Sequence, residues 1–431
     1  MKITRRAFID GLKQPSSLQT FVLVTFVAFV YFWRARPYLL KPQLFAEDGV
    51  LWLAEGYNKN ILALFQPVNG FLHFPERLFG FVVAHLPLQY APLLFVLTAW
   101  GLFMLLACYL ISSRTKILAN TYQRVFMALA LCLIANLQEF FFNFSNSVFL
   151  MGIIGALIMV ARPAKYKAVE VAEKAFFLLS SLTLPFAWFY LPIALFERFK
   201  YRKKTSFYLY VSLVASVVQL IYFLTSHVNR SPITIFSLFS EYTLLEIYNQ
   251  MIIPAVRFAR IDIPILDFTE HIYPVSIVFL SILTLLIAAI IVVKNSNRQV
   301  NYLLFFLAAM TLASIKSPTV NVPQALDAIK HMAIVTGANR YFVYGIVAVN
   351  LIFVKAAYMA IAPRARYAFM LLFVAFGLVT SLHYQSFYIN KDFMDFTVQY
   401  RDGISRFQSG KVKSVNILVN PSPWNMMLNR H

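Results

Sequence analysis

Charged residues, cysteines and repeats are scarce in this chain, and each scarcity excludes a class of protein. Of 431 residues only 13% are charged, and 18 are Asp or Glu. This charged share is about half that of a typical soluble domain. The two cysteines, Cys108 and Cys132, lie in apolar segments. We therefore expect them to pack as small apolar side chains and not to form a disulfide or bind a metal. No H-x-x-x-H or C-x-x-C spacing occurs, which argues against a metal motif. No internal repeat is visible, so an inverted-repeat transporter gains no support.

Long apolar runs dominate what is present. Hydrophobic residues make up 60% of the chain, and runs such as 90–111 are long enough to cross about 30 Å of hydrocarbon. The pattern predicts an all-α polytopic membrane protein with about 11 transmembrane helices. We expect spans near 18–34, 90–111, 122–137, 147–161, a hairpin within 174–197, then 206–226, 272–293, 300–315, 341–358 and 367–383.

The distribution of charge predicts the orientation. Lys2, Arg5, Arg6 and Lys13 precede the first span, which we expect to be an uncleaved helix with a cytoplasmic N-terminus. Cytoplasmic segments then hold 21 of the 38 Lys and Arg and 4 of the 18 Asp and Glu, and outer segments hold the rest. This split explains the net charge of +20 without a nucleic-acid partner. An ion-coupled pump needs charges within its spans, whereas we expect the apolar spans of this chain to be free of Asp, Glu, Lys and Arg.

The predicted outer segments divide the chain into a polytopic membrane domain, 1–383, and a small periplasmic tail, 384–431. Outer loops are expected at 35–89, 227–271 and 316–340. Enzymes that work at a membrane surface carry their polar chemistry in such loops, so we expect the candidate residues there.

Two parts of the first outer loop have helical patterns. The segment 47–65 predicts a helix along the membrane interface, with Trp52, Leu53 and Leu62 on its apolar side. The segment 71–88 is too short and too charged for a confident span and predicts a juxtamembrane helix.

The segment 174–197 has basic residues at both ends and contains Pro185 and Pro192. Two cytoplasmic ends this close predict a broken or re-entrant hairpin. Its free backbone groups must then be covered by protein or by a cavity.

The first outer loop carries an acidic pair, Glu47-Asp48, just before a helical pattern. One interpretation is helix capping, in which Asp satisfies free N–H groups at a helix start. The other is a general base, because a partly desolvated carboxylate accepts a proton from a sugar hydroxyl more readily. One carboxylate would take the proton while the other holds the acceptor.

Arg77 and Arg340 lie where outer loops meet apolar sequence. Such residues often only anchor a helix at the interface. They could also bind the phosphate of a lipid-linked donor, because a guanidinium offers two donors to phosphate oxygens. Lys316 and Lys330 have weaker claims to the same role.

Further polar and aromatic residues could line a sugar pocket, although turn contacts and an interfacial aromatic belt explain them equally well. They are Glu139, Asn143, Asn146, Trp52 and Tyr341. His73 and His85 are expected to be polar residues at the interface, not metal ligands.

Five stretches carry a resemblance to a known family. They are FAEDGVLWLAEGYNKNILALFQPVNGFLHFPERLFGFVVAHLPLQYAP, NLQEFFFNFSN, SLTLPFAWFYLP, ANRYFVYG and NPSPWNM. In this order they resemble the GT-C superfamily of membrane glycosyltransferases, which keep an acidic motif after the first span. Within it the chain looks closest to bacterial enzymes that add one sugar to O-antigen, such as serotype-converting glucosyltransferases. The acidic pair here is Glu-Asp, whereas several branches carry Asp-Asp or Asp-Glu.

The resemblance implies an inverting transfer of a hexose from a polyprenyl-phosphate donor to a lipopolysaccharide or other lipid-linked glycan. It makes Asp48 the favoured base, Glu47 its partner, and Arg340 a contact of the donor phosphate. It implies a multi-pass protein of a bacterial inner membrane with a periplasmic C-terminus, supplied by a separate donor-synthesising transferase and a flippase. No metal or other cofactor is expected. A lipid-linked glycan polymerase and a non-enzymatic glycolipid flippase remain as alternatives.

Overall fold

The computed structural model is built mainly of helices. It describes residues 17–134, 140, 143–201, 206–226, 244, 247–257, 275–316, 341–361, 365–391, 394–422 and 424–430. Six helices in these ranges are long and apolar enough to cross a membrane: Leu18–Leu40, Leu88–Ile111, Ser206–Thr225, Val278–Asn295, Arg298–Ile315 and Val343–Ala360. Shorter apolar helices cover Thr121–Leu133, Phe144–Val160 and Leu371–Thr380. These helices agree with the predicted all-α membrane class.

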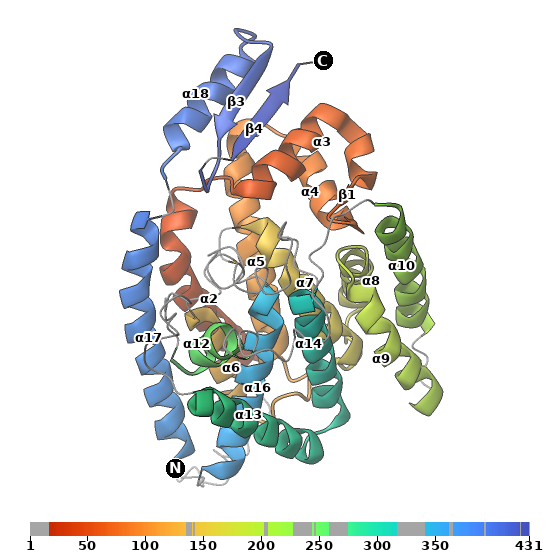
Figure 1. Cartoon of the computed structure of the whole chain (residues 1–431), viewed down its shortest axis with the longest axis vertical. Coiled ribbons are helices and arrows are strands. Elements are labelled where there is room, and N and C mark those ends of the chain that lie inside the picture. Colours follow the sequence, from red (N-terminus) through yellow and green to blue (C-terminus); the bar gives the residue numbers. More distant parts are fainter. Residues whose placement is uncertain are drawn as a thin grey trace.

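The long helices form one bundle (Figure 1). In chain order they are α2 (Ser17–Leu40), α5 (Ala91–Ile111), α6 (Thr121–Leu133), α7 (Phe144–Val160), α8 (Lys167–Ser181), α9 (Phe186–Tyr201), α10 (Ser206–Thr225), α13 (Val275–Asn295), α14 (Arg298–Lys316), α16 (Val343–Ala360) and α17 (Arg366–Lys391). A short π-helical turn, Tyr248–Ile252, and α12 (Ile253–Arg257) pack against α16.

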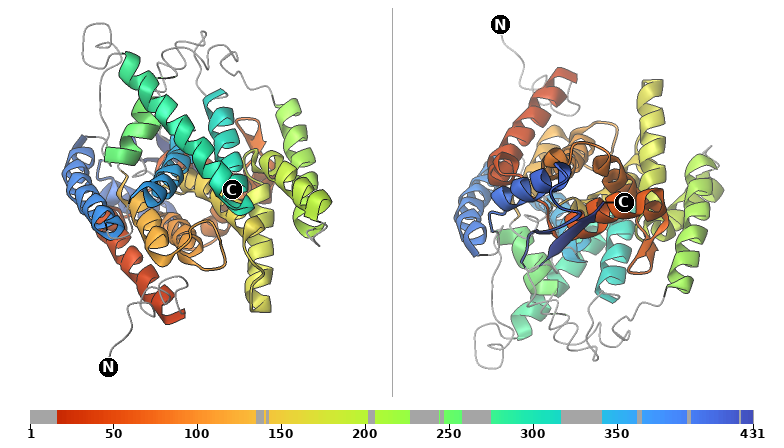
Figure 2. Two further views of the ribbon diagram at one scale, coloured as in Figure 1. Left: turned by 90° about the horizontal axis from the view of Figure 1, so that it is seen from below. Right: turned by 90° about the horizontal axis from the view of Figure 1, so that it is seen from above.

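Helix α7 lies at the centre of the bundle and is buried along almost its whole length. It contacts α5, α8, α9 and α14. The hydroxyl of Tyr190 packs against α7 and donates to Gly152 O at 2.7 Å. Glycine is needed at position 155 because a Cβ there would lie only 2.3 Å from this hydroxyl. Peripheral helices α2, α10, α13 and α17 instead expose many Leu, Ile, Val and Phe side chains, and Figure 2 shows them around the outside. This distribution suits a lipid environment.

The predicted hairpin within 174–197 is a pair of helices, α8 and α9, joined by residues 182–185. Pro185 immediately precedes α9 and Pro192 lies inside it. The turn is covered by the first loop: Phe74 N donates to Leu182 O at 3.2 Å, and His73 and Thr183 form a β-bridge. Protein therefore satisfies the backbone groups that the break in the helix leaves free.

The expectation of uncharged spans is wrong, because two arginines lie buried inside predicted spans. Arg34 of α2 donates to Cys132 O and, at 3.1 Å, to Ile134 O, which caps the C-terminal end of α6. Arg124 of α6 donates to Thr115 O and Leu118 O at 2.8 Å each. Both guanidinium groups therefore satisfy backbone carbonyls at helix and turn ends.

The first loop is not one long interfacial helix. It runs as a π-helical turn η1 (Asp48–Leu53), α3 (Ala54–Lys59), a 3₁₀ turn (Asn60–Phe65), a hairpin of β1 (Pro67–Val68) and β2 (Phe71–Leu72), α4 (Phe74–Ala84) and a 3₁₀ turn (Leu88–Tyr90). Trp52 and Leu53 are buried, whereas Leu62 is 70% exposed. The helix changes type after Lys59, at Asn60 with φ 54°, so the three residues of the predicted apolar side do not belong to one continuous helix.

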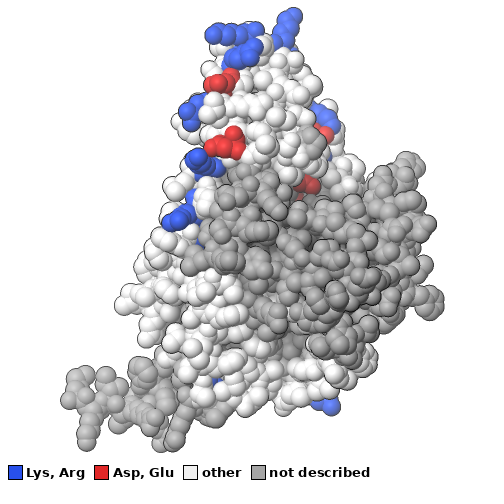
Figure 3. Space-filling model, turned by 60° about the vertical axis from the view of Figure 1, so that its left-hand side comes forward, with Lys and Arg blue, Asp and Glu red and all other residues white. Residues whose placement is uncertain are grey.

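The tail is a small α+β unit packed on the first loop. It contains α18 (Thr397–Gln408) and the antiparallel pair β3 (Ser414–Leu418) and β4 (Asn425–Asn429), with Leu418 opposite Asn425. Asn420 N donates to Leu44 O at 3.2 Å, and Asn420 O accepts from Ala46 N. We call residues 41–90 together with 394–430 the loop–tail end; it lies at the top of Figure 1. Charged side chains gather on it, and the described surface below it shows few (Figure 3).

Candidate functional site

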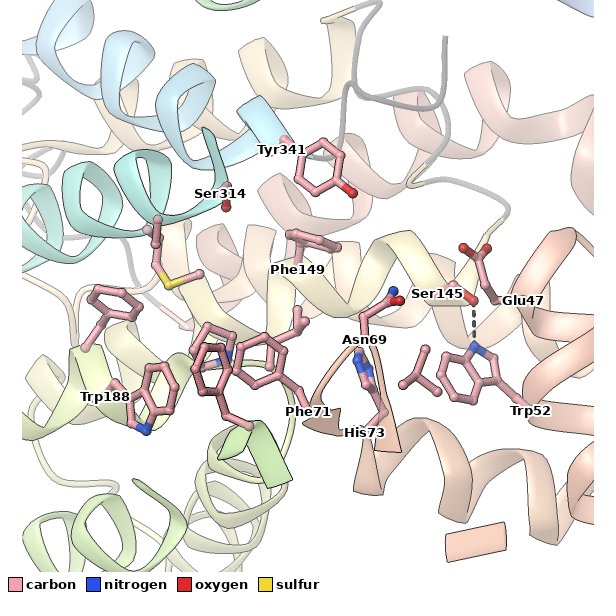
Figure 4. A pocket seen from close by; sticks show the side chains of 17 residues that line it. Glu47, Trp52, Asn69, Phe71, His73, Ser145, Phe149, Trp188, Ser314 and Tyr341 are labelled. Atoms are coloured by element: carbon pink, nitrogen blue, oxygen red, sulfur yellow. Dashed lines mark hydrogen bonds between the residues drawn. The ribbon is translucent and has the colours of Figure 1, made fainter. Parts of the chain in front are cut away.

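A cavity of about 250 Å³ lies between the loop–tail end and the helix bundle. The first loop supplies much of its lining, and α7, α9, α10 and α14 supply most of the rest. The lining residues are Glu47, Trp52, Val68, Asn69, Phe71, His73, Ser145, Phe149, Leu184, Pro185, Trp188, Phe189, Phe223, Met310, Ala313, Ser314 and Tyr341. Figure 4 shows Glu47 and Ser145 at one end, Trp188 at the other, and His73 and Asn69 between them. The cavity thus joins a polar end to an aromatic end.

The β1–β2 hairpin places Val68, Asn69 and Phe71 in the wall of this cavity, and His73 lines it directly after the second strand. Its turn is Asn69-Gly70, with φ values of 51° and 80°, which match the left-handed turn that Asn-Gly pairs favour. Gln219 of α10 clamps the second strand, because its amide accepts from Leu72 N at 2.9 Å and donates to Leu72 O at 3.0 Å. The hairpin fixes Asn69, Phe71 and His73 against the bundle.

Strained backbone gathers around the cavity. Among the described residues, Ala46, Asn60, Asn69 and Leu184 have positive φ without being glycine. Asn69 and Leu184 line the cavity, and Ala46 directly precedes the lining residue Glu47. Such strain persists only where surrounding contacts impose it, and Ala46 is held by its backbone bond to Asn420.

The two carboxylates of the acidic pair face different environments. Asp48 is fully buried, and its Oδ2 accepts from Phe144 N at 2.9 Å. Its Oδ1 accepts from Ser145 N at 2.9 Å and from Ser145 Oγ at 2.5 Å. Asp48 therefore caps α7, a helix distant in sequence, while Glu47 lines the cavity.

Burial also changes the acidity of Asp48. Desolvation raises the pKa of the Asp48 carboxyl to about 7, while the hydrogen bonds from Ser145 and Phe144 oppose this rise. The raised pKa fits the predicted desolvation of a carboxylate in this loop. Its oxygens, however, are directed at the α7 N-terminus.

Trp52 connects this cap to the cavity. Its indole Nε1 donates to Ser145 Oγ at 2.6 Å, and Ser145 Oγ donates in turn to Asp48. The Trp52 ring also lies 5.5 Å from the His73 ring, centroid to centroid. Trp52 was predicted as a substrate-binding residue, and the structure places it in the cavity wall.

Arg77 has a different environment from the one predicted. Its side chain is 2% exposed and does not line the cavity. The guanidinium donates to Leu51 O at 3.0 Å and to Glu55, and lies 5.0 Å from the centre of the Trp52 ring. Arg77 therefore holds η1 against α4, and this buried position does not fit the predicted contact with a donor phosphate.

A histidine–carboxylate pair lies in the same wall. His73 Nδ1 is 2.6 Å from Glu76 Oε1, and Thr183 Oγ1 donates to that same oxygen at 2.6 Å. Glu76 is 1% exposed. The sequence prediction gave His73 only a general interfacial role. The Asn-Gly turn four residues earlier is the signal that could have placed it beside a hairpin in the site.

The other predicted residues have mixed outcomes. Asn143 is the N-cap of α7 and accepts from Asn146 N at 3.2 Å, as the turn-capping interpretation predicted. Asn146 is also buried, and neither asparagine lines the cavity. Tyr341 does line it. The predictions for Arg340 and Glu139, and for Lys330, fall outside the described residues.

Within the part of the chain that the structure describes, no three His, Cys, Asp or Glu side chains lie together as a metal site would require. Comparison of the chain with protein-family models, with curated proteins and with solved structures found no match. The geometry of the cavity is therefore the basis for a functional proposal.

Proposed function

We propose that this protein is an inverting glycosyltransferase that uses a polyprenyl-phosphate sugar as donor. The observation that carries the proposal is a cavity with an aromatic end and a polar end that contains one carboxylate, Glu47. A lipid-linked sugar has the same division, with an apolar chain at one side and hydroxyls at the other. The aromatic end, with Phe71 and Trp188 5.8 Å apart between ring centroids, suits the first isoprene units.

The chemistry assigns the base role to Glu47 in place of Asp48. Glu47 would accept the proton of the acceptor hydroxyl as that oxygen attacks the anomeric carbon. The bond between this carbon and the phosphate oxygen would break, and polyprenyl phosphate would leave with the electron pair. A single displacement inverts the anomeric centre. Asp48 supports the step by holding α7, and with it Ser145, beside Glu47.

The topology belongs to the same proposal. We propose that the eleven bundle helices among the described residues, six of them long and apolar enough to span alone, all cross the membrane with a cytoplasmic N-terminus. The loop–tail end would then lie in the periplasm of a bacterial inner membrane. The donor would come from a separate transferase and a flippase, and the acceptor would be a surface glycan such as O-antigen. Reporter fusions after Lys204 and after the last residue should give opposite locations; the same location for both would contradict this orientation.

The test is transfer by purified protein in liposomes. We expect polyprenyl phosphate to be released and a lipid-linked glycan acceptor to gain the mass of one hexose. A ladder of products would instead identify a polymerase. Movement of intact donor across the bilayer, with no bond broken, would identify a flippase. Mass spectrometry of lipopolysaccharide from cells with and without the gene should show the same single addition.

A further inference from the structure

One ring nitrogen of His73 contacts the buried carboxyl group of Glu76, and the ring also lines the cavity. His73 Nδ1 lies 2.6 Å from Glu76 Oε1, where a hydrogen on Nδ1 can be donated to the carboxyl oxygen. No described residue hydrogen-bonds Nε2, and the ring lines the cavity. In Figure 4 it points from the hairpin toward Asn69.

Glu76 is positioned to support a positive charge on this ring. It is 1% exposed, and His73 is its only ion-pair partner among the described residues. Thr183 donates to the oxygen that faces His73, while Oε2 of Glu76 has no partner among the described residues. A buried carboxylate is costly without a cation beside it, and a ring that lies between Glu76 and an anionic ligand can donate from Nδ1 to the carboxylate and from Nε2 to the ligand.

His73 lies midway along the cavity. Trp188 and Phe71 pack together at the aromatic end, and Phe71 precedes His73 by two residues. Beyond His73, the Trp52 ring is 5.5 Å away and leads through Ser145 to the end that holds Glu47. A lipid-linked sugar that places its chain on Trp188 and its anomeric carbon near Glu47 would place its phosphate at His73.

We propose that His73 binds the phosphate of the lipid-linked donor through Nε2–H, with Glu76 and Thr183 as positioning residues. This inference rests on the proposed glycosyl transfer. As the bond to the anomeric carbon breaks, its electron pair moves onto the phosphate, whose charge changes from about −1 to about −2. A fixed imidazolium stabilises the charge that develops, so its contribution is larger in the transition state than in the ground state. His73 thus takes the place predicted for Arg77, whose guanidinium is used inside the loop.

The experiment measures binding and turnover separately on full-length protein in nanodiscs. Polyprenyl monophosphate without sugar is the binding probe, and intrinsic tryptophan fluorescence, to which Trp52 and Trp188 of the cavity contribute, follows its binding. His73→Gln keeps an amide N–H donor but cannot carry a positive charge, so it should weaken binding of the probe by roughly ten-fold, the difference between a charge-assisted and a neutral hydrogen bond, and should lower kcat further. The matched control is His85→Gln, an exposed histidine at the end of the same helix α4, which should change neither value.

Glu76→Gln tests the positioning role, because it keeps the shape of the side chain but removes its charge. We expect kcat to fall by several-fold with a smaller change in KM, whereas a purely structural defect would lower the amount of folded protein at unchanged kcat. If the wild type transfers sugar and His73→Gln binds and turns over like the wild type, the inference is wrong and the proposed function stands. If the wild type neither transfers sugar nor binds the probe, the proposed function itself fails.

Discussion

The two ends of the helix bundle both bury charged side chains but use them differently. At the end opposite the loop–tail end, Arg114 donates to Glu173 at 2.6 and 2.9 Å, and Tyr109 donates to the same carboxylate at 2.5 Å. Arg114 also donates to Arg162 O at 2.7 Å. Each of these groups closes a turn between helices, so the network ends on the protein itself.

At the loop–tail end, a similar network ends at the cavity. Asp48 accepts hydrogen bonds from the N-terminus of α7, and Arg77 donates to Leu51 O of η1 and to Glu55. Their neighbours Glu47 and His73 are turned to the cavity wall. Burial and charge alone therefore do not mark a site. A polar group can take part in binding only where it faces a space that can hold a ligand.

The largest expected effect follows from replacing the carboxylate that faces the cavity. Glu47→Gln should lower turnover by roughly 100-fold or more, because it removes the general base while keeping the shape of the side chain. Transfer from purified lipid-phosphate sugar measures this effect. Asp402→Asn, an exposed carboxylate on α18, is the control and should act like the wild type. Normal turnover by Glu47→Gln would break the comparison between the two ends.

Asp48→Asn should alter the pH dependence of stability more than turnover. The folded pKa of about 7 lies above the ordinary value of 3.8, so the folded protein holds this proton more tightly than the unfolded chain. The unfolding free energy of the wild type should therefore fall as the pH rises from about 4 to about 7, and the variant should lose this slope. Thermal unfolding in detergent between pH 4 and pH 8 measures it. Parallel slopes in the two proteins would mean that another group titrates.

The contrast between Glu47 and Asp48 shows how far sequence reasoning reached. The positions of polar residues between apolar runs single out Glu47, Asp48, Trp52 and Tyr341. All of these except Asp48 line the cavity. Which of the two carboxylates faces the cavity could not be predicted. It depends on the N-terminus of α7, which reaches Asp48 from 96 residues away in sequence.

The fold was more predictable than the site because hydrophobic length carries most of the signal for a membrane helix. The helix pair α8–α9 followed from Pro185 and its basic flanks. The β1–β2 hairpin and the packing of the tail on the loop depend on non-local contacts, such as Gln219 with Leu72 and Asn420 with Leu44. The hydropathy pattern of the sequence does not predict such contacts.

Asn420→Ala should destabilise the loop–tail end by about 1–3 kcal/mol. Asn420 is fully buried, and its Nδ2 donates to Gln43 Oε1 and Met394 O at 2.9 Å each, while Oδ1 accepts from Met394 N at 3.0 Å. Alanine would leave these groups without partners. Thermal unfolding should shift down, and turnover should fall as the backbone before Glu47 loosens. Unchanged stability would show that the tail is not needed to order the acidic motif.

Arg114→Gln tests the opposite end and should cost about 1–2 kcal/mol of stability. The change breaks the paired hydrogen bonds to Glu173, which is 8% exposed in its side chain, but part of the loss is relieved because Arg114 is 27% exposed. Turnover of the folded protein should equal that of the wild type, since this network borders no ligand in the proposed mechanism. A fall in kcat at full folding would show that the two ends are coupled through the bundle.

The smallest effect is expected for an ion pair at the edge of the loop–tail end. Lys41 Nζ lies 3.1 Å from Asp395 Oδ2, and their side chains are 71% and 50% exposed. Thr397, which donates its backbone N–H at 3.1 Å, and then Lys41 lower the pKa of Asp395 to about 2. Water screens so exposed a pair, so Lys41→Ala should change the unfolding free energy by less than about 1 kcal/mol.

Turnover by Lys41→Ala should also be unchanged, because the buried Asn420 and not this pair docks the tail. Thermal unfolding at low and high salt provides the control, since a surface pair weakens as salt screens it whereas buried hydrogen bonds respond little. A large loss of stability at low salt that disappears at high salt would assign the docking of the tail to surface charge. In that case the loop–tail end would be a more loosely held unit than its buried contacts indicate, and Glu47 would move with it.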